Sequence, residues 1–160
     1  MQIKKSSRHS KIAGDFGETL VLYWLSKHGF ECAKVDHTGI DLIAFNPHTN
    51  ERMGISVKSR TRTAGAEKEF VKLPADDFDK IEAACKAFAC QPYFAVVVDA
   101  GETIRVFIVS VIHTLQIYPR TAAGSGWRMT PGHLAKYALD PDVMTFELHV
   151  KDGRWWKSAG

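Results

Sequence analysis

Apolar residues recur at helical spacing over residues 14–28, which predicts the first helix of the chain. The apolar positions are Phe16, Leu20, Val21, Leu22, Tyr23, Trp24 and Leu25. So many apolar side chains predict a largely buried helix, which Gly29 can end. Glu18 adjoins this apolar run in the second turn, a position where an acidic residue calls for an explanation.

Three short segments rich in strand-forming residues follow, at residues 30–35, 40–45 and 52–58. The last two are separated by a strong turn signal at residues 46–50, so they predict a hairpin or a meander. Residues 59–69 are rich in Thr, Arg, Ala and Gly without a clear period. They predict an exposed, mobile loop, and such loops often carry function.

The second half of the chain alternates between the two kinds of pattern. A helix that Asp76 or Asp77 can cap is expected to run to about residue 89. Its apolar face consists of Phe78, Ile81, Ala84, Cys85 and Phe88. Residues 93–98 are a continuous apolar run, which is typical of a strand covered on both faces, and residues 103–109 are expected to pair with it.

Beyond Ser110 the pattern is weaker. It predicts a short helix at residues 111–117, a Gly-rich loop at 124–126, and another short helix opened by Thr130 and Pro131. A terminal strand is expected at residues 143–150, with a turn at Asp152 and Gly153. Trp127, Trp155 and Trp156 could stack on nucleic-acid bases, although tryptophans late in a small domain more often close its core or form an interface.

The composition indicates one globular domain. A chain of 160 residues that is 45% hydrophobic and 24% charged can bury one core. We expect a flexible basic arm at residues 1–11, a core at 12–110 and a C-terminal extension at 111–160 packed on that core. Because no apolar run is long enough to span a membrane and the amino terminus lacks the features of a secretory signal, we expect a cytoplasmic protein with no membrane partner.

The cysteines and histidines do not suggest a structural metal. Cys32, Cys85 and Cys90 are odd in number and lack a CxxC spacing, which favours reduced core thiols over a disulfide or a zinc site. The seven histidines are scattered, with no pair at the spacing of a zinc-binding helix. His9, His37 and His113 have no paired partner in the sequence.

The net charge of +3 is too small to establish a nucleic-acid partner, but its distribution is more informative. Two basic clusters could contact phosphates; they comprise Lys4, Lys5, Arg8 and Lys11 at the start of the chain, and Arg60 and Arg62 after Lys58. The alternative is a solvated tail and an ordinary polar loop.

Two strands place candidate catalytic groups. Asp41 begins an apolar strand just after Gly39, and Lys58 ends the next strand. If these strands form an antiparallel hairpin, the acid and the lysine should converge. Alternation puts Ser56 on the same face as Lys58, while Val57 offers its backbone carbonyl. Phosphodiester hydrolysis needs a cation to neutralise developing charge, and commonly a positive side chain beside it.

The order of these residues resembles the PD-(D/E)XK nuclease superfamily, and most closely the branch with archaeal Holliday-junction resolvases and small restriction-like nucleases. The motifs are GDFGE at residues 14–18, GIDLIA at 39–44 and SVKS at 56–59. The resemblance covers roughly residues 12–100 and has no counterpart in the last third of the chain. It implies an α/β fold with a restriction-endonuclease-like core (α-β-β-β-α-β, a mixed sheet flanked by helices) and a small C-terminal α+β extension.

The resemblance also implies roles for individual residues. Asp41 would ligate a catalytic Mg²⁺ or Mn²⁺, Lys58 would orient the attacking water or stabilise charge, and Glu18 would approach the metal from the first helix. Val57 would add its carbonyl. The chain departs from the family at Ser56, where Glu or Asp is usual and Gln occurs, and a hydroxyl is a poorer magnesium ligand. Either Glu18 compensates, or cleavage is slow or absent.

The implied function is that of a metal-dependent endonuclease acting on DNA, either structure-specific or restriction-like, with branched DNA among its substrates. A homodimer is expected, because cutting two strands needs two sites. The alternative is a catalytically weak or inactive nuclease-fold module that binds nucleic acid or a partner protein, and RNA is a weaker alternative as the substrate. Each residue also has a structural interpretation: Asp41 could cap a turn, Lys58 could reach solvent at a strand end, and Glu18 could be an exposed helix carboxylate.

Overall fold

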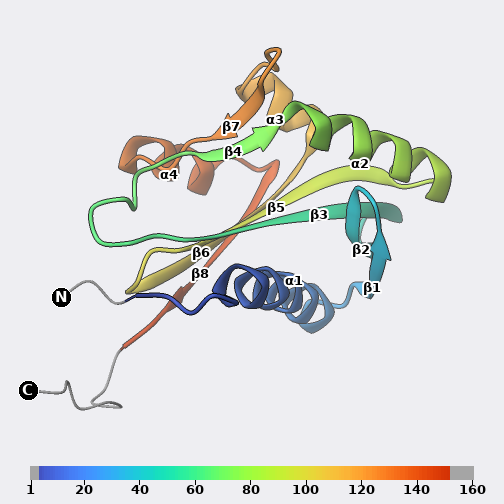
Figure 1. Cartoon of the computed structure of the whole chain (residues 1–160). Helices are drawn as coiled ribbons and strands as arrows, with labels where there is room; N and C mark the ends of the chain where they lie inside the picture. Colours follow the sequence, from blue (N-terminus) through green and yellow to red (C-terminus); the bar gives the residue numbers. More distant parts are fainter. Residues whose placement is uncertain (1–3, 152–160) are drawn as a thin grey trace, which may run out of the picture.

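The computed structural model describes residues 4–151 and confirms the α/β class (Figure 1). A six-stranded sheet has the order β1-β2-β3-β5-β6-β8, and β4 pairs with β7 in a second, two-stranded sheet. The helices are α1 (His9–Lys27), α2 (Ala75–Phe88), α3 (Val111–Ile117) and α4 (Pro131–Leu139). The strands are β1 (Glu31–His37), β2 (Ile40–Asn46), β3 (Glu51–Thr61), β4 (Val71–Pro74), β5 (Gln91–Asp99), β6 (Thr103–Ser110), β7 (Gly124–Trp127) and β8 (Val143–His149).

The large sheet is mixed and is covered on both faces. The pair β3 and β5 is parallel, whereas the other neighbouring strands in this sheet run antiparallel. Figure 1 shows α1 against one face, with α2, α4 and the small β4–β7 sheet against the other. Each face of the large sheet has its own apolar core. This is expected where a strand is a continuous apolar run, because its side chains are then apolar on both faces.

Helix α1 is less buried than its apolar composition predicts. Its fully buried positions are Gly17, Val21 and Leu25, while Phe16 and Tyr23 are 45% and 58% exposed. The reason is the close approach at Gly17, where an added Cβ would lie 1.8 Å from the Ser59 hydroxyl oxygen. The stripe around Gly17 therefore faces the sheet, and the expectation of burial was wrong for Phe16 and Tyr23. No helix in the described part of the chain is both long enough and apolar enough to cross a membrane.

Strand β3 extends further than its sequence pattern suggests. We expected it to end at Lys58, but it continues to Thr61 because residues 53–61 pair in parallel with β5, up to Thr61 opposite Asp99. The predicted loop is accordingly shorter. Its first residues are ladder positions, and Arg60 and Arg62 extend the strand face that carries Lys58.

The C-terminal third is integrated into the fold. Its last strand, β8, pairs with β6 along residues 103–109 and completes the large sheet. The predicted Gly-rich loop is instead strand β7, which pairs with β4, a strand that no sequence pattern suggested. Trp127 of β7 is fully buried and stacks on Tyr137, so it closes the core rather than contacting bases. Trp155 and Trp156, like the predicted turn at Asp152, lie outside the described residues.

Two smaller expectations concern helix α2 and the cysteines. The N-cap of α2 is Pro74, so the predicted capping role of Asp76 or Asp77 was wrong; both acids lie in the first turn. The cysteines are free in the described structure, with Cys85 and Cys90 buried and Cys32 half-buried. Burial raises the pKa of the Cys85 thiol to about 11, so this group stays protonated at neutral pH.

Candidate active site

The β1–β2 hairpin positions Asp41 through Gly39. This glycine has φ +97°, in the left-handed region that favours glycine, and an added Cβ would lie 2.3 Å from the carbonyl oxygen of Lys80 in α2. The tip of the hairpin therefore packs directly against the backbone of α2. Asp41 is the second residue of β2, immediately beyond this contact, so its place depends on a turn that only glycine fits.

The pairing between β2 and β3 ends at Leu42, the residue next to Asp41 on β2. Their ladder runs from Asn46 opposite Glu51 to Leu42 opposite Ile55. Two residues further along β3, the Val57 N–H donates to the side-chain Oδ2 of Asp41 at 2.7 Å rather than to a backbone carbonyl of β2. The N–H and C=O of a strand residue point to the same edge, so the Val57 carbonyl also faces this side. We call the point formed by Asp41 and Val57 the β2–β3 fork.

Asp41 is a carboxylate in an unfavourable setting. Burial raises its pKa, and the nearby charge of Glu18 adds to the rise. The hydrogen bond from Val57 and the positive charges of Lys58 and Lys34 act in the opposite direction without cancelling it. A further positive charge at the fork would therefore be favourable, because it would offset the desolvation of the carboxylate.

Glu18 reaches the same neighbourhood from α1. Its Oε2 lies 2.9 Å from Nζ of Lys34 on β1, and its side chain is only 20% exposed. The hydrogen bond to Glu18 raises the pKa of Lys34, so this lysine stays charged. The structure thus brings Glu18 and Asp41 close enough to influence each other, with Lys34 neutralising part of their charge. The sequence did not single out Lys34.

Lys58 lies on the α2 side of the sheet and pairs with Asp77. Its Nζ is 2.8 Å from Asp77 Oδ2, and the two side chains are 18% and 23% exposed. Asp77 lies in the first turn of α2, where the helix dipole favours a negative charge. From the sequence it could be seen only as a helix-start residue, because nothing in the pattern connects it with Lys58. It is the main site residue that the sequence did not indicate.

Ser56, the residue at which the sequence departs from the pattern that it resembles, is buried in β3. It is 6% exposed and lies opposite Phe94 in the ladder with β5. Strand alternation places its side chain on the face of Lys58, as predicted. A carboxylate is nevertheless present on this face, because α2 supplies Asp77 beside Lys58.

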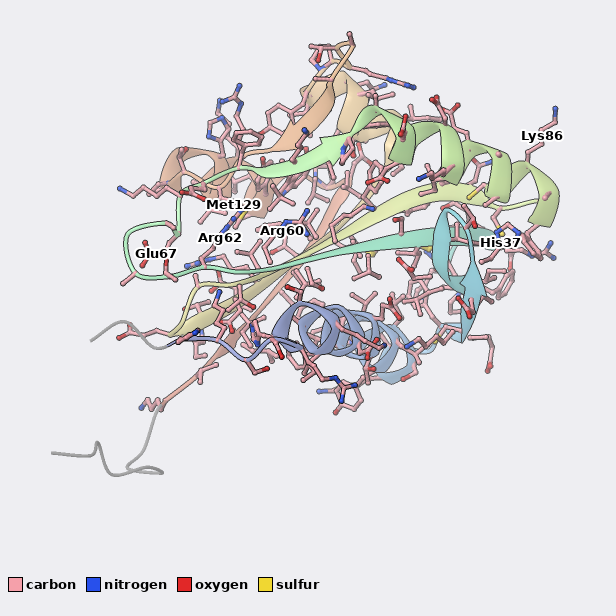
Figure 2. All side chains as sticks on the ribbon, in the orientation of Figure 1. His37, Arg60, Arg62, Glu67, Lys86 and Met129 are labelled. Atoms are coloured by element: carbon pink, nitrogen blue, oxygen red, sulfur yellow. The ribbon has the colours of Figure 1, made fainter. Side chains whose placement is uncertain are left out.

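The basic residues near the strand end have different settings. Figure 2 shows Arg60 and Arg62 on the side of β3 that faces Met129. Arg62 is mostly buried: it donates to the carbonyl oxygen of Phe70 at 3.0 Å and lies 3.5 Å from a Glu69 carboxylate oxygen, so it fastens the loop after β3. Arg60 donates to the carbonyl oxygen of Ser59 at 2.7 Å.

The amino-terminal basic residues lie around the start of α1. The ammonium group of Lys5 donates to the carbonyl oxygen of Thr61 at 2.9 Å, which ties this segment to the end of β3. Lys11 is already within α1 and pairs with Asp15 at 3.2 Å. Lys4 and Arg8 are exposed. Residues 9–11 of the expected arm are thus helical, and phosphate contact by these residues stays a prediction.

A second cluster of ionisable side chains lies on other elements. His113 of α3, with Asp140 and Asp142 after α4, has ligand-type atoms within 4.8 Å of one another, an arrangement that could hold a metal ion. His113 Nε2 is 2.7 Å from Asp140 Oδ2, and Asp140 Oδ1 accepts from the Asp142 N–H at 2.9 Å. The first contact raises the pKa of His113 and lowers that of Asp140. The sequence did not link His113 to an acidic partner, because the two lie far apart in the chain.

The order of helix, three strands, helix and strand around a mixed sheet is the order that the resemblance of the motifs predicted. Among solved structures, the chain is similar to Hjc from Archaeoglobus fulgidus, a Holliday junction resolvase from an archaeal hyperthermophile. The TM-score is 0.54 with 20% sequence identity, over 72% of this chain and 88% of Hjc. No family model and no curated protein matches the chain. The likeness therefore concerns the fold, as the resemblance of the motifs predicted.

The donor set at the fork suits a hard divalent cation. Mg²⁺ and Mn²⁺ prefer oxygen ligands, and Mg²⁺ commonly uses one or two carboxylates and keeps several waters. Asp41, Glu18 and the Val57 carbonyl offer oxygens of this kind, and the burial-raised pKa of Asp41 indicates a carboxylate short of positive charge. The residues present therefore fit such an ion.

Proposed function

We propose that the protein is a Mg²⁺- or Mn²⁺-dependent endonuclease that hydrolyses DNA phosphodiester bonds at the β2–β3 fork. Asp41 and Glu18 would hold the cation with the Val57 carbonyl. The observation that carries the proposal is the Asp41 carboxylate, fixed by the Val57 N–H where the two strands separate and electrostatically coupled to both Glu18 and Lys58. The Hjc-like fold supports it.

Each residue has a defined task in this proposal. A cation held by Asp41, Glu18 and the Val57 carbonyl would offset the negative charge that develops on the phosphate and would lower the pKa of the attacking water. Lys58 presents an ammonium group beside this water or the scissile phosphate. Asp77 keeps the Lys58 side chain in one orientation through the 2.8 Å ion pair, which is a positioning role. Ser56 leaves the cation with one carboxylate fewer than is usual in the family, so modest rates are expected.

The proposed substrate is DNA, with branched DNA included because the fold is that of a junction resolvase. Lys4, Arg8 and Arg60 are the basic residues best placed for phosphate contacts, since Arg62 is engaged by the loop after β3. We further propose a homodimer. Ile12, Phe16 and Tyr23 leave an apolar stripe of α1 exposed, which a second copy could cover.

A cleavage assay tests the proposal. The wild-type chain is incubated with supercoiled, linear, single-stranded and four-way-junction DNA in Mg²⁺, in Mn²⁺ and in chelator. Cation-dependent products are expected from the wild type and from Asp76→Ala, an exposed acid of α2 that serves as the control. Asp41→Ala should be inactive. Equal activity of Asp41→Ala and the wild type, or no activity with either cation, would refute the nuclease.

Two observations favour an alternative, a non-catalytic module on the same fold. Ser56 provides no carboxylate, and Lys58 is already neutralised by Asp77. This alternative predicts DNA binding that does not depend on divalent cations, and no cleavage. Cleavage by the wild type or by Ser56→Glu that Lys58→Ala abolishes would exclude it. Competition between RNA and DNA at a stated salt concentration decides which nucleic acid is preferred.

A further inference from the structure

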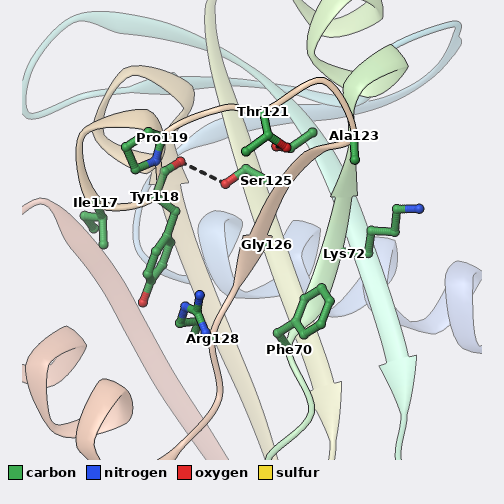
Figure 3. Close-up of a pocket in the computed structure, with 11 residues that line it drawn as sticks. Phe70, Lys72, Ile117, Tyr118, Pro119, Thr121, Ala123, Ser125, Gly126 and Arg128 are labelled. Atoms are coloured by element: carbon green, nitrogen blue, oxygen red, sulfur yellow. Dashed lines mark hydrogen bonds between the residues drawn. The ribbon is translucent and has the colours of Figure 1, made fainter.

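A pocket lies on the outer face of the small β4–β7 sheet, away from the proposed active site. It has a volume of about 720 Å³, within the range of ligand pockets. Figure 3 shows the rings of Phe70 and Tyr118 on opposite sides of β7, with Arg128 between them. We call it the β4–β7 pocket; its lining includes Phe70, Lys72, Tyr118, Gly126 and Arg128.

The floor of the pocket depends on glycine. Gly126 lies opposite Lys72 in the β4–β7 ladder, and an added Cβ would lie 2.7 Å from the Phe70 ring. The neighbouring Val71 and Trp127 point the other way, into the core. The absence of a side chain at Gly126 therefore lets the Phe70 ring lie directly on the backbone of β7, and Phe70 is still 56% exposed. An exposed aromatic residue beside a glycine floor suits the face of a flat ligand.

The opposite wall is rigid. The Tyr118 hydroxyl contacts the hydroxyl of Tyr137, which donates to the Arg128 carbonyl oxygen at 2.9 Å. The Tyr118 carbonyl oxygen accepts from Ser125 Oγ at 2.8 Å, and its ring meets Trp127 edge to face. Tyr118 is thus held from several directions, so a ligand would bind a preformed surface rather than order a loose one.

The charge of the pocket is entirely positive. Lys72 and Arg128 line it, and no acidic side chain does so in the described structure. Within residues 4–151 neither cation forms an ion pair, and the Arg128 guanidinium lies 6.0 Å from the Tyr118 ring centroid. Two cations beside two aromatic faces form the combination that binds single-stranded nucleic acid, in which bases stack and phosphates attract cations.

We propose that the β4–β7 pocket binds an unpaired nucleotide of a nucleic-acid strand, with the base against Phe70 and Tyr118 and the adjoining phosphates near Lys72 and Arg128. This deepens the proposed nuclease function, on which it rests for the class of ligand. Strand β4 continues directly into α2, which carries Asp77 beside Lys58. The pocket would therefore hold the single-stranded part of a branched substrate at the outer surface of the small sheet, on the same side of the large sheet as α2 and Lys58.

Binding in the absence of divalent cations tests the pocket separately from catalysis. The probes are a fluorescein-labelled oligothymidylate and a blunt duplex of equal length, followed by anisotropy with the full chain in chelator. Phe70→Ala and Arg128→Ala should each weaken oligothymidylate binding roughly tenfold, while duplex binding changes less than about twofold. Phe88→Ala removes an aromatic side chain that is 41% exposed on α2 and should leave both affinities unchanged. Lys72 lies at an exposed strand position, so Lys72→Glu should weaken oligothymidylate binding as Arg128→Ala does, without changing the fold.

The proposal is overturned if the wild type does not bind oligothymidylate, if single-strand and duplex affinities fall together, or if Phe88→Ala matches Phe70→Ala. Displacement of the oligonucleotide by an acidic peptide at equal or lower concentration would also overturn it and indicate a peptide site. Failure of the proposed nuclease activity can be distinguished from failure of the proposed binding site. If the wild type cleaves nothing but its oligothymidylate binding still depends on Phe70, the pocket stands and the nuclease does not.

Discussion

Asp41, the proposed metal ligand, should impose a cost on folding. Because burial raises its pKa in the folded state, the ionised carboxylate destabilises the fold at pH values above that pKa. This penalty is absent below the pKa of the unfolded chain, about 3.9, and develops as the pH rises through the folded value. Asp41→Asn keeps an oxygen for the Val57 N–H, so it should raise the melting temperature at pH 7 and have little effect at pH 3. Cleavage should fall at least ~100-fold.

Thermal unfolding of wild type and Asp41→Asn at the two pH values checks this prediction, with Asp76→Asn as an exposed control. A lower melting temperature of Asp41→Asn at pH 7 would contradict it. Addition of Mn²⁺ should raise the melting temperature of the wild type more than that of Asp41→Asn, because the variant has an amide in place of the Asp41 carboxylate.

Asp77 is the second residue with a separable role. If it positions Lys58 through their ion pair, Asp77→Asn should lower kcat by about 10–100-fold with little change in KM. Asp76→Asn changes a neighbouring acid in the same turn of α2 and should leave kcat unaltered. A higher kcat of Asp77→Asn would show instead that Asp77 restrains Lys58.

The sequence could indicate Asp41 and Lys58 because both lie in short motifs whose order along the chain can be recognised. Asp77 could not be found in this way, because only the packing of α2 on the sheet brings it to Lys58.

At the scale of elements, the β1–β2 hairpin is the most sensitive point. Gly39→Ala combines an unfavourable positive φ with a contact of 2.3 Å to the Lys80 carbonyl oxygen, so it should destabilise the protein by more than about 2 kcal/mol. Gly65 also has a positive φ, +92°, but open space around it, so Gly65→Ala should cost only about 1 kcal/mol. Urea unfolding compares the two, and similar losses would mean that packing against α2 is unimportant.

The elements that the sequence missed share a physical cause. Strand β7 consists of Gly124, Ser125, Gly126 and Trp127, and glycine-rich segments favour loops unless a partner strand stabilises them. That partner is β4, which follows the long loop after β3. The extension of β3 to Thr61 likewise depends on its parallel neighbour β5. Local pattern was sufficient to predict α2, β2, β5 and β6, for example α2 from its apolar spacing and β5 from its continuous apolar run, although Phe88 at the end of α2 is 41% exposed.

For the whole molecule, the C-terminal third has to be considered part of the fold. Strand β8 completes the large sheet against β6, and Trp127 and Tyr137 belong to the same core as Phe78 of α2. The sequence indicated an appended unit because the resemblance stops near residue 100, and a resemblance cannot show how a later strand pairs. The contacts that fasten this region therefore affect the stability of the entire chain.

The His113–Asp140 pair joins α3 to the turn between α4 and β8, and it should make global stability depend on pH. The raised pKa of His113 stabilises the fold fully below the unfolded value of about 6.5, and this stabilisation is lost as the pH rises through the folded value. The lowered pKa of Asp140 stabilises the fold above about pH 3.9, and this stabilisation is lost as the pH falls through the folded value.

The His113–Asp140 pair therefore stabilises the fold most between about pH 4 and 6.5. His113→Gln should lower the melting temperature clearly at pH 5 and much less at pH 9, whereas His133→Gln, which changes a partly exposed histidine of α4 outside this pair, should not show this dependence. If added Mn²⁺ or Zn²⁺ raised the wild-type melting temperature more at pH 8 than at pH 5, and His113→Gln removed that gain, the cluster with Asp142 would be a metal site rather than a hydrogen-bonded clasp, because metal binding requires the neutral imidazole.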